Sequence, residues 1–362
     1  MGTSPMTNEF NANHQLNMGI TTSAVSISSS ADGLFHPTYA HDLDRALRFI
    51  QEHDQFLVVA HVNPDGDAIS STLAIGWLLT LWGKSFTMVN ENQIPGRLQF
   101  MANTDNVIIH EALEQANAPA FKAVICVDCA DYDRIGSIKE WITSDVPLLN
   151  IDHHPTNNRY GSVACIRDNA AATAEILFDM FAQGKVNLDL DVSTMLYTGL
   201  LTDTGGFRYS NTTPHVMAIA SALLAIGVDG NDIADRLLEK MSFAQMSLIQ
   251  KGLARLAFSD DHRIAWLYIT PEDMVETGAL NEDLEGLVNY PRNVEGVEVG
   301  LLFKVNTNGR IKVSMRSAGK VNVAEVAQTF GGGGHVRAAG CTLTDPLDDT
   351  IKAVLEQVKQ RL

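Results

Sequence analysis

The sequence predicts an α/β protein in which a doubly wound, mainly parallel sheet is followed by a smaller α+β domain. Two observations support this prediction. Up to about residue 240, short apolar runs typical of buried strands alternate with segments of helical period. Beyond about residue 258, apolar and alternating runs follow one another, two of them joined by the hairpin signal Asn306-Thr307-Asn308-Gly309.

The N-terminal segment, residues 1–40, is rich in Ser, Thr and Asn and has only scattered apolar side chains. It lacks the charged start and apolar core of a secretory signal, so we expect a disordered extension. The first element after it is an amphipathic helix over residues 42–52, which presents Leu43, Leu47 and Ile50 on one face.

The predicted catalytic domain spans residues 41–240. Its expected strands are residues 56–60, 85–90, 123–127 and 148–151. Its expected helices after the first are residues 69–82, 138–143, 170–181, 192–201, 214–225 and 231–239. Because strands and helices alternate along the chain, the strands are expected to lie parallel.

A longer helix within residues 241–258 is expected to connect this domain to a C-terminal domain of residues 259–362. In that domain the predicted strands are residues 264–269, 297–305, 310–315 and 338–343, with a helix at 323–330. The change from parallel to hairpin connections marks the domain as α+β.

Composition restricts the function. A formal net charge of −17 argues against wrapping of long nucleic acid, which needs many Lys and Arg contacts to phosphates. No apolar run reaches the roughly 18 residues of a membrane span, so we expect a soluble protein without a membrane partner. Four cysteines in 362 residues make no disulfide framework and favour a reducing, cytoplasmic setting. The motif Cys126-x-x-Cys129 is more simply explained by core packing than by a zinc or redox pair.

Metal-ligating side chains follow three predicted strands and one predicted helix. They are His61, Asp65 and Asp67; Asp128; Asp152, His153 and His154; and Asp203. Five carboxylates gathered at one sheet edge would repel one another unless divalent cations offset their charge. Carboxylate and imidazole ligands without thiolate favour Mn²⁺, with Mg²⁺ or Co²⁺ as substitutes, and there are enough of them for two ions. Two ions suit in-line hydrolysis of a phosphoester.

A second candidate region lies between Lys304 and Arg337, which has six basic residues and one acidic residue, Glu325. A solvated hairpin face would ordinarily be the more common explanation of such a charge excess. The run Gly331-Gly332-Gly333-Gly334-His335 favours an anion site, because glycines can expose backbone N–H groups to a phosphate.

These motifs together resemble the DHH phosphoesterases with their associated C-terminal domain, and within them the NrnA-like oligoribonucleases that also act as 3′-phosphoadenosine-5′-phosphate phosphatases. The resemblance runs from about residue 42 to the C-terminus. It implies that Asp128 bridges two Mn²⁺ ions, one held also by His61 and Asp65. The remaining ligands of the other ion would be Asp67, His153 and Asp203.

The same resemblance implies that His154 contacts the scissile phosphate or protonates the leaving oxygen, with Asp152 orienting an imidazole. Substrate phosphate would be held in the C-terminal domain by Arg316, Ser317, Gly332, Gly333, Gly334 and His335. Arg134 and Asn157 are further candidates for the site. For each, a purely structural role in its loop is an equally good explanation.

The leading hypothesis is therefore a Mn²⁺-dependent phosphodiesterase and phosphatase. It would degrade short oligoribonucleotides to mononucleotides and convert 3′-phosphoadenosine-5′-phosphate to AMP, and a homodimer is a family expectation. The alternatives are hydrolysis of linear dinucleotides such as pApA, hydrolysis of pyrophosphate or polyphosphate, and a nucleotide sensor without turnover. A sensor is disfavoured because no expected metal ligand is missing.

Overall fold

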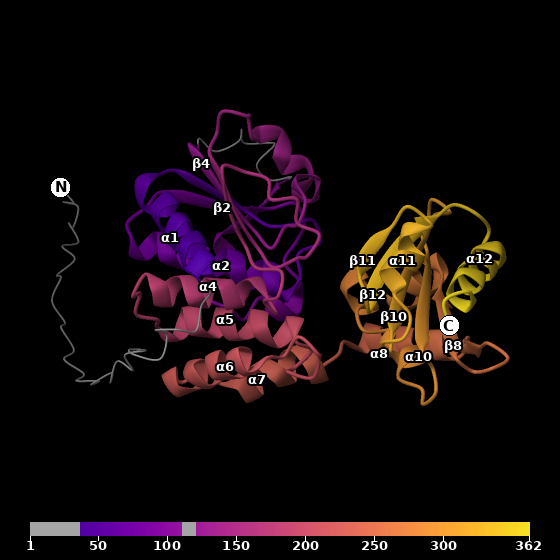
Figure 1. Ribbon diagram of the computed structural model, residues 1–362. Helices are drawn as coiled ribbons and strands as arrows, with labels where there is room; N and C mark the ends of the chain where they lie inside the picture. The colour runs from indigo at the N-terminus through magenta and orange to yellow at the C-terminus, as the bar shows by residue number, and fades with distance from the viewer. Residues whose placement is uncertain (1–36, 111–120) are drawn as a thin grey trace, which may run out of the picture. The chain divides into compact units, whose positions relative to one another are not determined.

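A computed structural model describes residues 37–110 and 121–362. The chain divides into two compact units that meet between Leu238 and Glu239 (Figure 1). Each unit has its own sheet, and each is described below by itself. The predicted extension of residues 1–40 falls largely outside the described residues.

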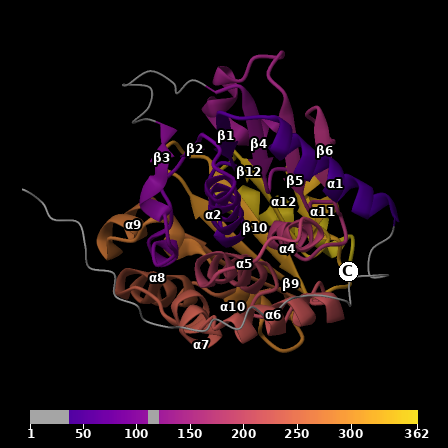
Figure 2. The same cartoon turned by 90° about the vertical axis from the view of Figure 1, so that its left-hand side faces the viewer.

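The first unit is built on a parallel sheet of six strands in the order β3-β2-β1-β4-β5-β6. The strands are β1 (Phe56–Val59), β2 (Phe86–Asn90), β3 (Val107–Ile109), β4 (Ala123–Val127), β5 (Leu148–Asp152) and β6 (Val163–Ile166). Figure 2 shows these six strands in this order from left to right. Strand order reverses between β1 and β4, and ligands of open α/β sheets bind beyond the carboxyl ends of the strands at such a point.

The helices of this unit are α1 (Pro37–Glu52), α2 (Gly66–Leu81), α4 (Thr173–Gln183), α5 (Leu190–Asp203), α6 (Pro214–Ile226) and α7 (Gly230–Ala234). One face of the sheet is covered by α1, α2 and α4, α5 packs on α2 and α4, and α6 and α7 pack on α5 in a further layer (Figure 1). A smaller apolar cluster covers the other face beneath the 3₁₀ segment η3 (Tyr132–Trp141). The remaining elements are the 3₁₀ turns η1 (Gly96–Leu98) and η2 (Thr104–Asn106) and the short π-helix η4 (Asp235–Glu239).

Several boundaries differ from the sequence expectation. Helix α1 begins at Pro37, inside the segment expected to be disordered. The helix expected at residues 138–143 is the 3₁₀ segment η3, which Gly136 interrupts with φ 80°. Strands β3 and β6 were not expected. Helix α4 begins at Thr173 rather than at Ala170, and this shift matters for the site.

The second unit contains a mixed sheet of six strands in the order β11-β12-β10-β9-β8-β7. They are β7 (Ala257–Phe258), β8 (Ile264–Ile269), β9 (Val299–Val305), β10 (Ile311–Ser317), β11 (Gly333–His335) and β12 (Ala338–Leu343). All neighbours are antiparallel except β8 and β9. The hairpin expected between β9 and β10 is confirmed by their antiparallel register.

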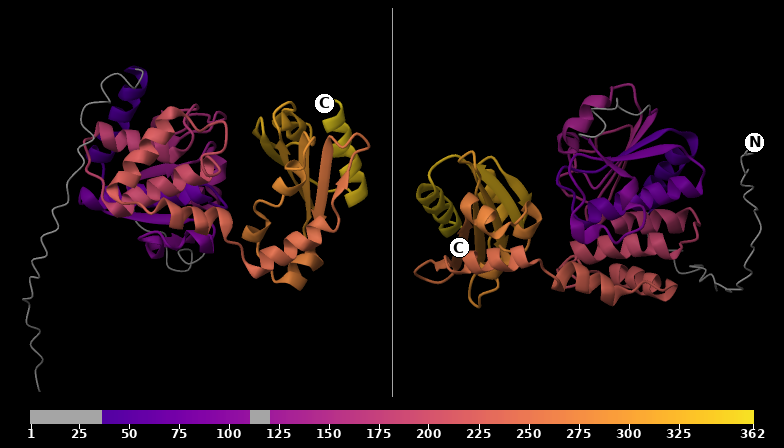
Figure 3. Two further views of the ribbon diagram at one scale, coloured as in Figure 1. Left: turned by 90° about the horizontal axis from the view of Figure 1, so that it is seen from below. Right: turned by 180° about the vertical axis from the view of Figure 1, so that it is seen from behind.

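Helices lie on both faces of this sheet, as the two views of Figure 3 show. They are α8 (Phe243–Leu253), α9 (Pro271–Thr277), α10 (Asn289–Arg292), α11 (Val323–Gln328) and α12 (Leu347–Lys359), with the 3₁₀ turn η5 (Asn281–Leu284). The helices α9, α10 and α12 were not expected, and α8 is shorter than the predicted connector. The glycine run, expected as an anion site, begins beyond the end of α11, and its last two glycines lie in the edge strand β11.

Candidate metal centre

The predicted ligands converge at the carboxyl edge of the parallel sheet, beside the reversal in strand order. His61, Asp65 and Asp67 follow β1, and Asp128 follows β4. Asp152 ends β5 and is followed by His153 and His154, whereas Asp203 is the last residue of α5. Helix α5 packs beside α2 and α4, and this packing brings its end to the same edge.

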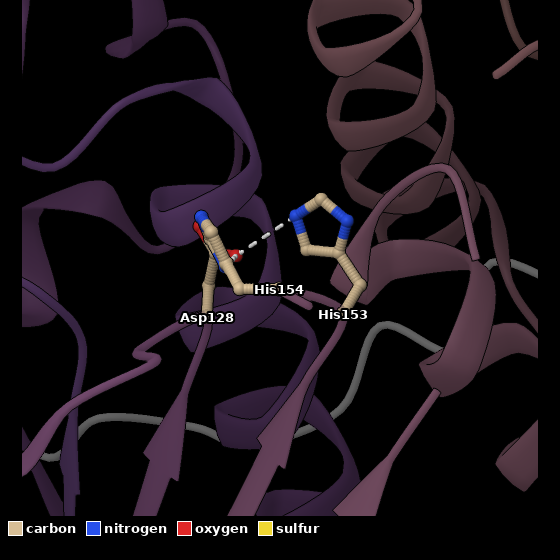
Figure 4. A group of neighbouring side chains, drawn as sticks. All are labelled: Asp128, His153 and His154. Atoms are coloured by element: carbon tan, nitrogen blue, oxygen red, sulfur yellow. Dashed lines mark ion pairs between the residues drawn. The ribbon is translucent and has the colours of Figure 1, made fainter. Parts of the chain in front are cut away.

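Asp128 is the residue around which the others gather. Its Oδ2 lies 3.5 Å from His61 Nε2, and its Oδ1 lies 3.5 Å from His153 Nε2. Its backbone has φ 54°, a left-handed conformation uncommon outside glycine but tolerated by Asp and Asn. Figure 4 shows Asp128 beside the double histidine, with a dashed line for its ion pair with His153. Each oxygen of this one carboxylate therefore faces a different group of ligands.

The first group consists of His61, Asp65 and Asp128, whose ligand atoms lie within 4.8 Å of one another. His61 Nδ1 bonds the carbonyl of Val62 at 2.8 Å, which leaves Nε2 toward the carboxylates. Asp65 caps helix α2, because its Oδ1 accepts the amides of Asp67 and Ala68 at 3.2 Å each. Its Oδ2 lies 3.9 Å from His61 Nε2.

The second group consists of Asp67, His153 and Asp203. His153 Nε2 lies 3.3 Å from Asp203 Oδ2, and its Nδ1 bonds the carbonyl of Ala170 at 3.3 Å. Asp67 is fully buried and accepts the first two amides of α4, from Thr173 at 2.6 Å and from Ala174 at 3.0 Å. Thus a proposed ligand from α2 accepts hydrogen bonds from the first backbone amides of a different helix, α4.

The electrostatics of the site favour divalent cations. Burial, and then the neighbouring Asp128, raises the pKa of Asp67 to about 8. Burial likewise raises the pKa of Asp203 well above its usual range. Burial also opposes the charge of Asp128, but hydrogen bonds from His153 and His61 hold its pKa well below the ordinary value. The metal-free site therefore retains protons where bound cations would take their place.

His61 and His153 complete this picture. Burial alone would lower the pKa of His61, but its interactions with Asp128 and Asp65 raise it to about 9. The pKa of His153 also lies well above its usual value, because Asp128 and Asp203 outweigh burial. Carboxylate oxygens and imidazole nitrogens in two adjoining groups fit two divalent ions.

His154 is held by a separate chain of hydrogen bonds. Its Nδ1 lies 2.7 Å from Asp152 Oδ1, and Asn157 donates to Asp152 Oδ2 at 2.6 Å. A carboxylate can only accept, so Nδ1 carries the proton and donates to Asp152. Asn157 therefore supports the site through Asp152.

Arg134 and the pair Cys126 and Cys129, singled out in the sequence, have structural roles near the site. The carbonyl of Arg134 accepts the Val62 amide at 2.8 Å, which fixes the loop that carries His61. Cys126 and Cys129 are buried thiols, and Cys126 Sγ lies 3.0 Å from the Tyr160 hydroxyl. This agrees with the packing interpretation of the cysteine pair.

A separate group of metal-capable side chains, Glu175, Asp179 and His215, lies away from these ligands on α4 and α6. Arg167 Nη1 lies 2.9 Å from Asp179 Oδ2 and 3.3 Å from Glu175 Oε1. His215 Nε2 lies 2.8 Å from the other oxygen of Asp179. The guanidinium already balances the carboxylates, so this group is an ion-pair network that anchors α4.

In the second unit, Arg316 and His335 lie in one register line across three strands. Ala338 of β12 pairs with Arg316 of β10 on one side and with His335 of β11 on the other. Directly opposed residues of antiparallel strands point to the same face of a sheet, and Ala338 is a small residue between the two. The line lies on the face opposite Val313 and Met315, which belong to the core.

Two predicted substrate residues are placed differently. Ser317 is buried, and its hydroxyl donates to Glu298 Oε1 at 3.0 Å. The amide of Gly332 donates to the carbonyl of Ala327 at 2.9 Å and so terminates α11. The Ser317 hydroxyl and the Gly332 amide are therefore both hydrogen-bonded within the chain. Gly333 and Gly334 lie exposed in β11 beside His335.

Thr173 was missed by the sequence reasoning. It is fully buried, and its hydroxyl donates to Asp128 Oδ1 at 3.1 Å while its amide donates to Asp67. A threonine near the start of a predicted helix carries no local sign of contact with residues so far away in sequence.

Two family models match this chain. The model described as DHH family, N-terminal domain, matches residues 55–200, and the model described as DHHA1 domain matches residues 264–362. Among the helices of residues 37–110 and 121–362, none combines the length and the apolar character that a membrane span needs.

Curated relatives and a solved structure cover most of the chain. A Thermus thermophilus protein named bifunctional oligoribonuclease and PAP phosphatase NrnA is 34% identical over 306 residues, which are 84% of this chain and 89% of the relative. A Bacillus subtilis protein of the same name is 26% identical over 311 residues, or 82% and 92% of the two chains. The crystal structure of an exopolyphosphatase-related protein from Bacteroides fragilis has the same fold, with TM-score 0.81, 24% identity and coverage of 88% and 96%.

Proposed function

This chain belongs to the DHH family of phosphoesterases, and we propose that it uses two Mn²⁺ ions to hydrolyse short oligoribonucleotides and 3′-phosphoadenosine-5′-phosphate. The observation that carries the proposal is the placement of Asp128. One of its oxygens faces His61 and the other faces His153, so a single carboxylate is shared between two groups of ligands. A carboxylate shared in this way could ligate two closely spaced ions at once.

The proposed ligands are His61, Asp65 and Asp128 for one ion, and Asp67, Asp128, His153 and Asp203 for the other. When bound, the ions would supply Lewis acidity toward the phosphate and lower the pKa of a water molecule. The chain's own residues hold this arrangement rigid: α2 and α4 orient Asp65 and Asp67 through their first amides. His154, which Asp152 orients, would contact the scissile phosphate or protonate the leaving oxygen.

The choice of Mn²⁺ is supported by the donor set. It combines carboxylates with imidazoles and includes no thiolate, a mixture that suits Mn²⁺ better than structural zinc. The cysteines at positions 126, 129, 165 and 341 are free thiols, which supports the proposed reducing, cytoplasmic setting.

The proposed substrates rest on the names of the relatives and on cations in the second unit. Arg316 and His335 flank Ala338 on one sheet face and would hold a substrate phosphate, with the exposed Gly333 and Gly334 beside them. Arginine binds phosphate with paired, charge-assisted hydrogen bonds, which gives it geometric selectivity for this group. Homodimer formation remains a prediction.

The test is turnover by chelator-treated protein to which Mn²⁺ is returned. The substrates are RNAs of two to five residues, 3′-phosphoadenosine-5′-phosphate, pApA and inorganic pyrophosphate, with a 20-residue RNA as the long control. We expect hydrolysis of the short RNAs and of the bisphosphate nucleotide only in the presence of metal. Absence of turnover on every substrate would refute the enzyme proposal, and turnover of pyrophosphate alone would refute the proposed substrate class.

A further inference from the structure

The residues at the start of α4 contact three of the proposed metal ligands without being ligands themselves. The segment Ala170–Ala174 is buried throughout. The carbonyl of Ala170 accepts a bond from His153 Nδ1, and the amides of Thr173 and Ala174 donate to Asp67.

Thr173 is the only residue of this segment whose described side chain reaches a proposed ligand. Its Oγ1 lies 3.1 Å from Asp128 Oδ1, the oxygen that also lies 3.5 Å from His153 Nε2 and 3.6 Å from His154 Nδ1. Of these partners, the hydroxyl makes the shortest contact with this oxygen. It therefore limits rotation of the carboxylate about its χ2 angle, and this rotation determines which lone pairs face each group of ligands.

The backbone of Asp128 increases the importance of this contact. Its left-handed φ of 54° is held by the amide, which donates to the Ile151 carbonyl at 2.9 Å. A side chain on a strained main chain stays in its functional position only when its surroundings determine that position. Thr173 supplies that constraint from a helix that the ion-pair network of Arg167, Glu175 and Asp179 fixes in place.

We propose that Thr173 is a positioning residue, whose hydroxyl fixes the carboxylate of Asp128 so that its two oxygens are presented to two metal ions at once. The inference rests on the proposed function for the assignment of Asp128 as the shared ligand. It assigns to Thr173 no contact with substrate. Its hydroxyl acts as a hydrogen-bond donor to an anionic acceptor, a role that valine cannot fill and serine can.

The test compares three variants of the full-length protein. Thr173→Val removes the hydroxyl at nearly constant volume, and Thr173→Ser retains it. The matched control is Thr198→Val, at a fully buried threonine of α5 whose hydroxyl has no hydrogen-bond partner within the described parts of the chain. If Thr173→Val does not fold, as judged by far-ultraviolet circular dichroism, Thr173→Ala replaces it in the same comparison.

Metal affinity is measured on chelator-treated protein by the electron paramagnetic resonance signal of free Mn²⁺, which needs no turnover. We expect Thr173→Val to weaken Mn²⁺ binding by about 10- to 100-fold, the usual effect of losing a residue that orients a metal ligand. Thr173→Ser and Thr198→Val should bind within about threefold of the unmodified chain. With saturating Mn²⁺, the KM for 3′-phosphoadenosine-5′-phosphate should be unchanged in all three.

Unchanged Mn²⁺ affinity in Thr173→Val would overturn the proposal, and so would an equal loss in Thr173→Ser or Thr198→Val. The proposed function is judged separately. A chain that binds Mn²⁺ as expected but turns over no phosphoester would contradict the proposed activity and leave the positioning role of Thr173 intact.

Discussion

Replacing Asp128 by asparagine tests whether one carboxylate serves two metal ions. Asparagine has almost the same shape and tolerates the left-handed φ of 54° at this position, so the backbone should be preserved. The substitution removes one negative charge and changes one oxygen to an NH₂ group. It therefore acts on both groups of ligands, since Oδ2 faces His61 and Oδ1 faces His153.

The size of the effect follows from what each group retains. Without Asp128 the first group keeps only His61 and Asp65, whereas the second keeps Asp67, His153 and Asp203. We expect the first ion to be lost and the second to bind more weakly. Removing a single preorganised electrostatic group commonly lowers kcat by about 10²–10³. Since both ions are affected here, kcat/KM should fall by at least about 10³, or about 4 kcal/mol.

The assay is equilibrium dialysis against Mn²⁺, with metal per chain determined by atomic absorption and kcat/KM measured in parallel. Asp65→Asn is the matched control, because Asp65 belongs to only one group and its loss should remove only one ion. Asp191→Asn, at an exposed position of α5, should change neither value. Two ions bound with unaltered affinity in Asp128→Asn would refute the shared-ligand reasoning, as would loss of both ions in Asp65→Asn.

Three further results are expected. Arg316→Ala should raise KM by about 10- to 100-fold with kcat nearly unchanged, because one charged hydrogen bond contributes about 1.5–3 kcal/mol. The control is Arg310→Ala, at an exposed position beside the hairpin turn, which should leave KM unchanged. A fall in kcat alone in Arg316→Ala would contradict the binding role. Removal of metal with EDTA should abolish turnover, and added Mn²⁺ should restore it. Turnover by protein whose metal content has been measured as zero would be inconsistent with the metal centre. Burial raises the pKa of Asp273, but hydrogen bonds from Arg255 and Thr270 lower it to about 2, below the unfolded value of about 3.9. The stability that this residue adds is therefore present above pH 4 and is lost as the pH falls toward 2. Over that range the difference in urea unfolding free energy between the unmodified chain and Asp273→Asn should shrink by about 2 kcal/mol, whereas a constant difference would contradict the pairing of Asp273 with Arg255.

The ligand positions could be predicted because each is tied to a local pattern. The apolar run that forms β1 ends just before His61, and the run that forms β4 ends just before Asp128. Parallel strands bring their carboxyl ends to one edge whatever their order, so convergence followed from the α/β class alone. The strand order, which places β1 beside β4, was not predicted.

What sequence could not show is the part of the site built by distant contacts. Helix α4 begins at Thr173, and the residue before it, Ala172, has no side chain that could cap the helix. No local sequence signal reveals that Asp67 supplies this cap or that Thr173 bonds Asp128. The fold of the glycine run was missed for a related reason, since glycine has little intrinsic strand propensity and Gly333 and Gly334 join β11 only by pairing with β12.

The cap on α4 has a consequence for the order in which the chain folds. Asp67 and Thr173 are 106 residues apart, so the first amides of α4 obtain their acceptor only after the two segments have come together. Closing so large a loop costs conformational entropy before the bond can form, so the start of α4 should become protected from hydrogen exchange later than its interior during refolding. The proposed metal site and the first turn of α4 should therefore form in the same step, because both depend on the contact between Asp67 and Thr173.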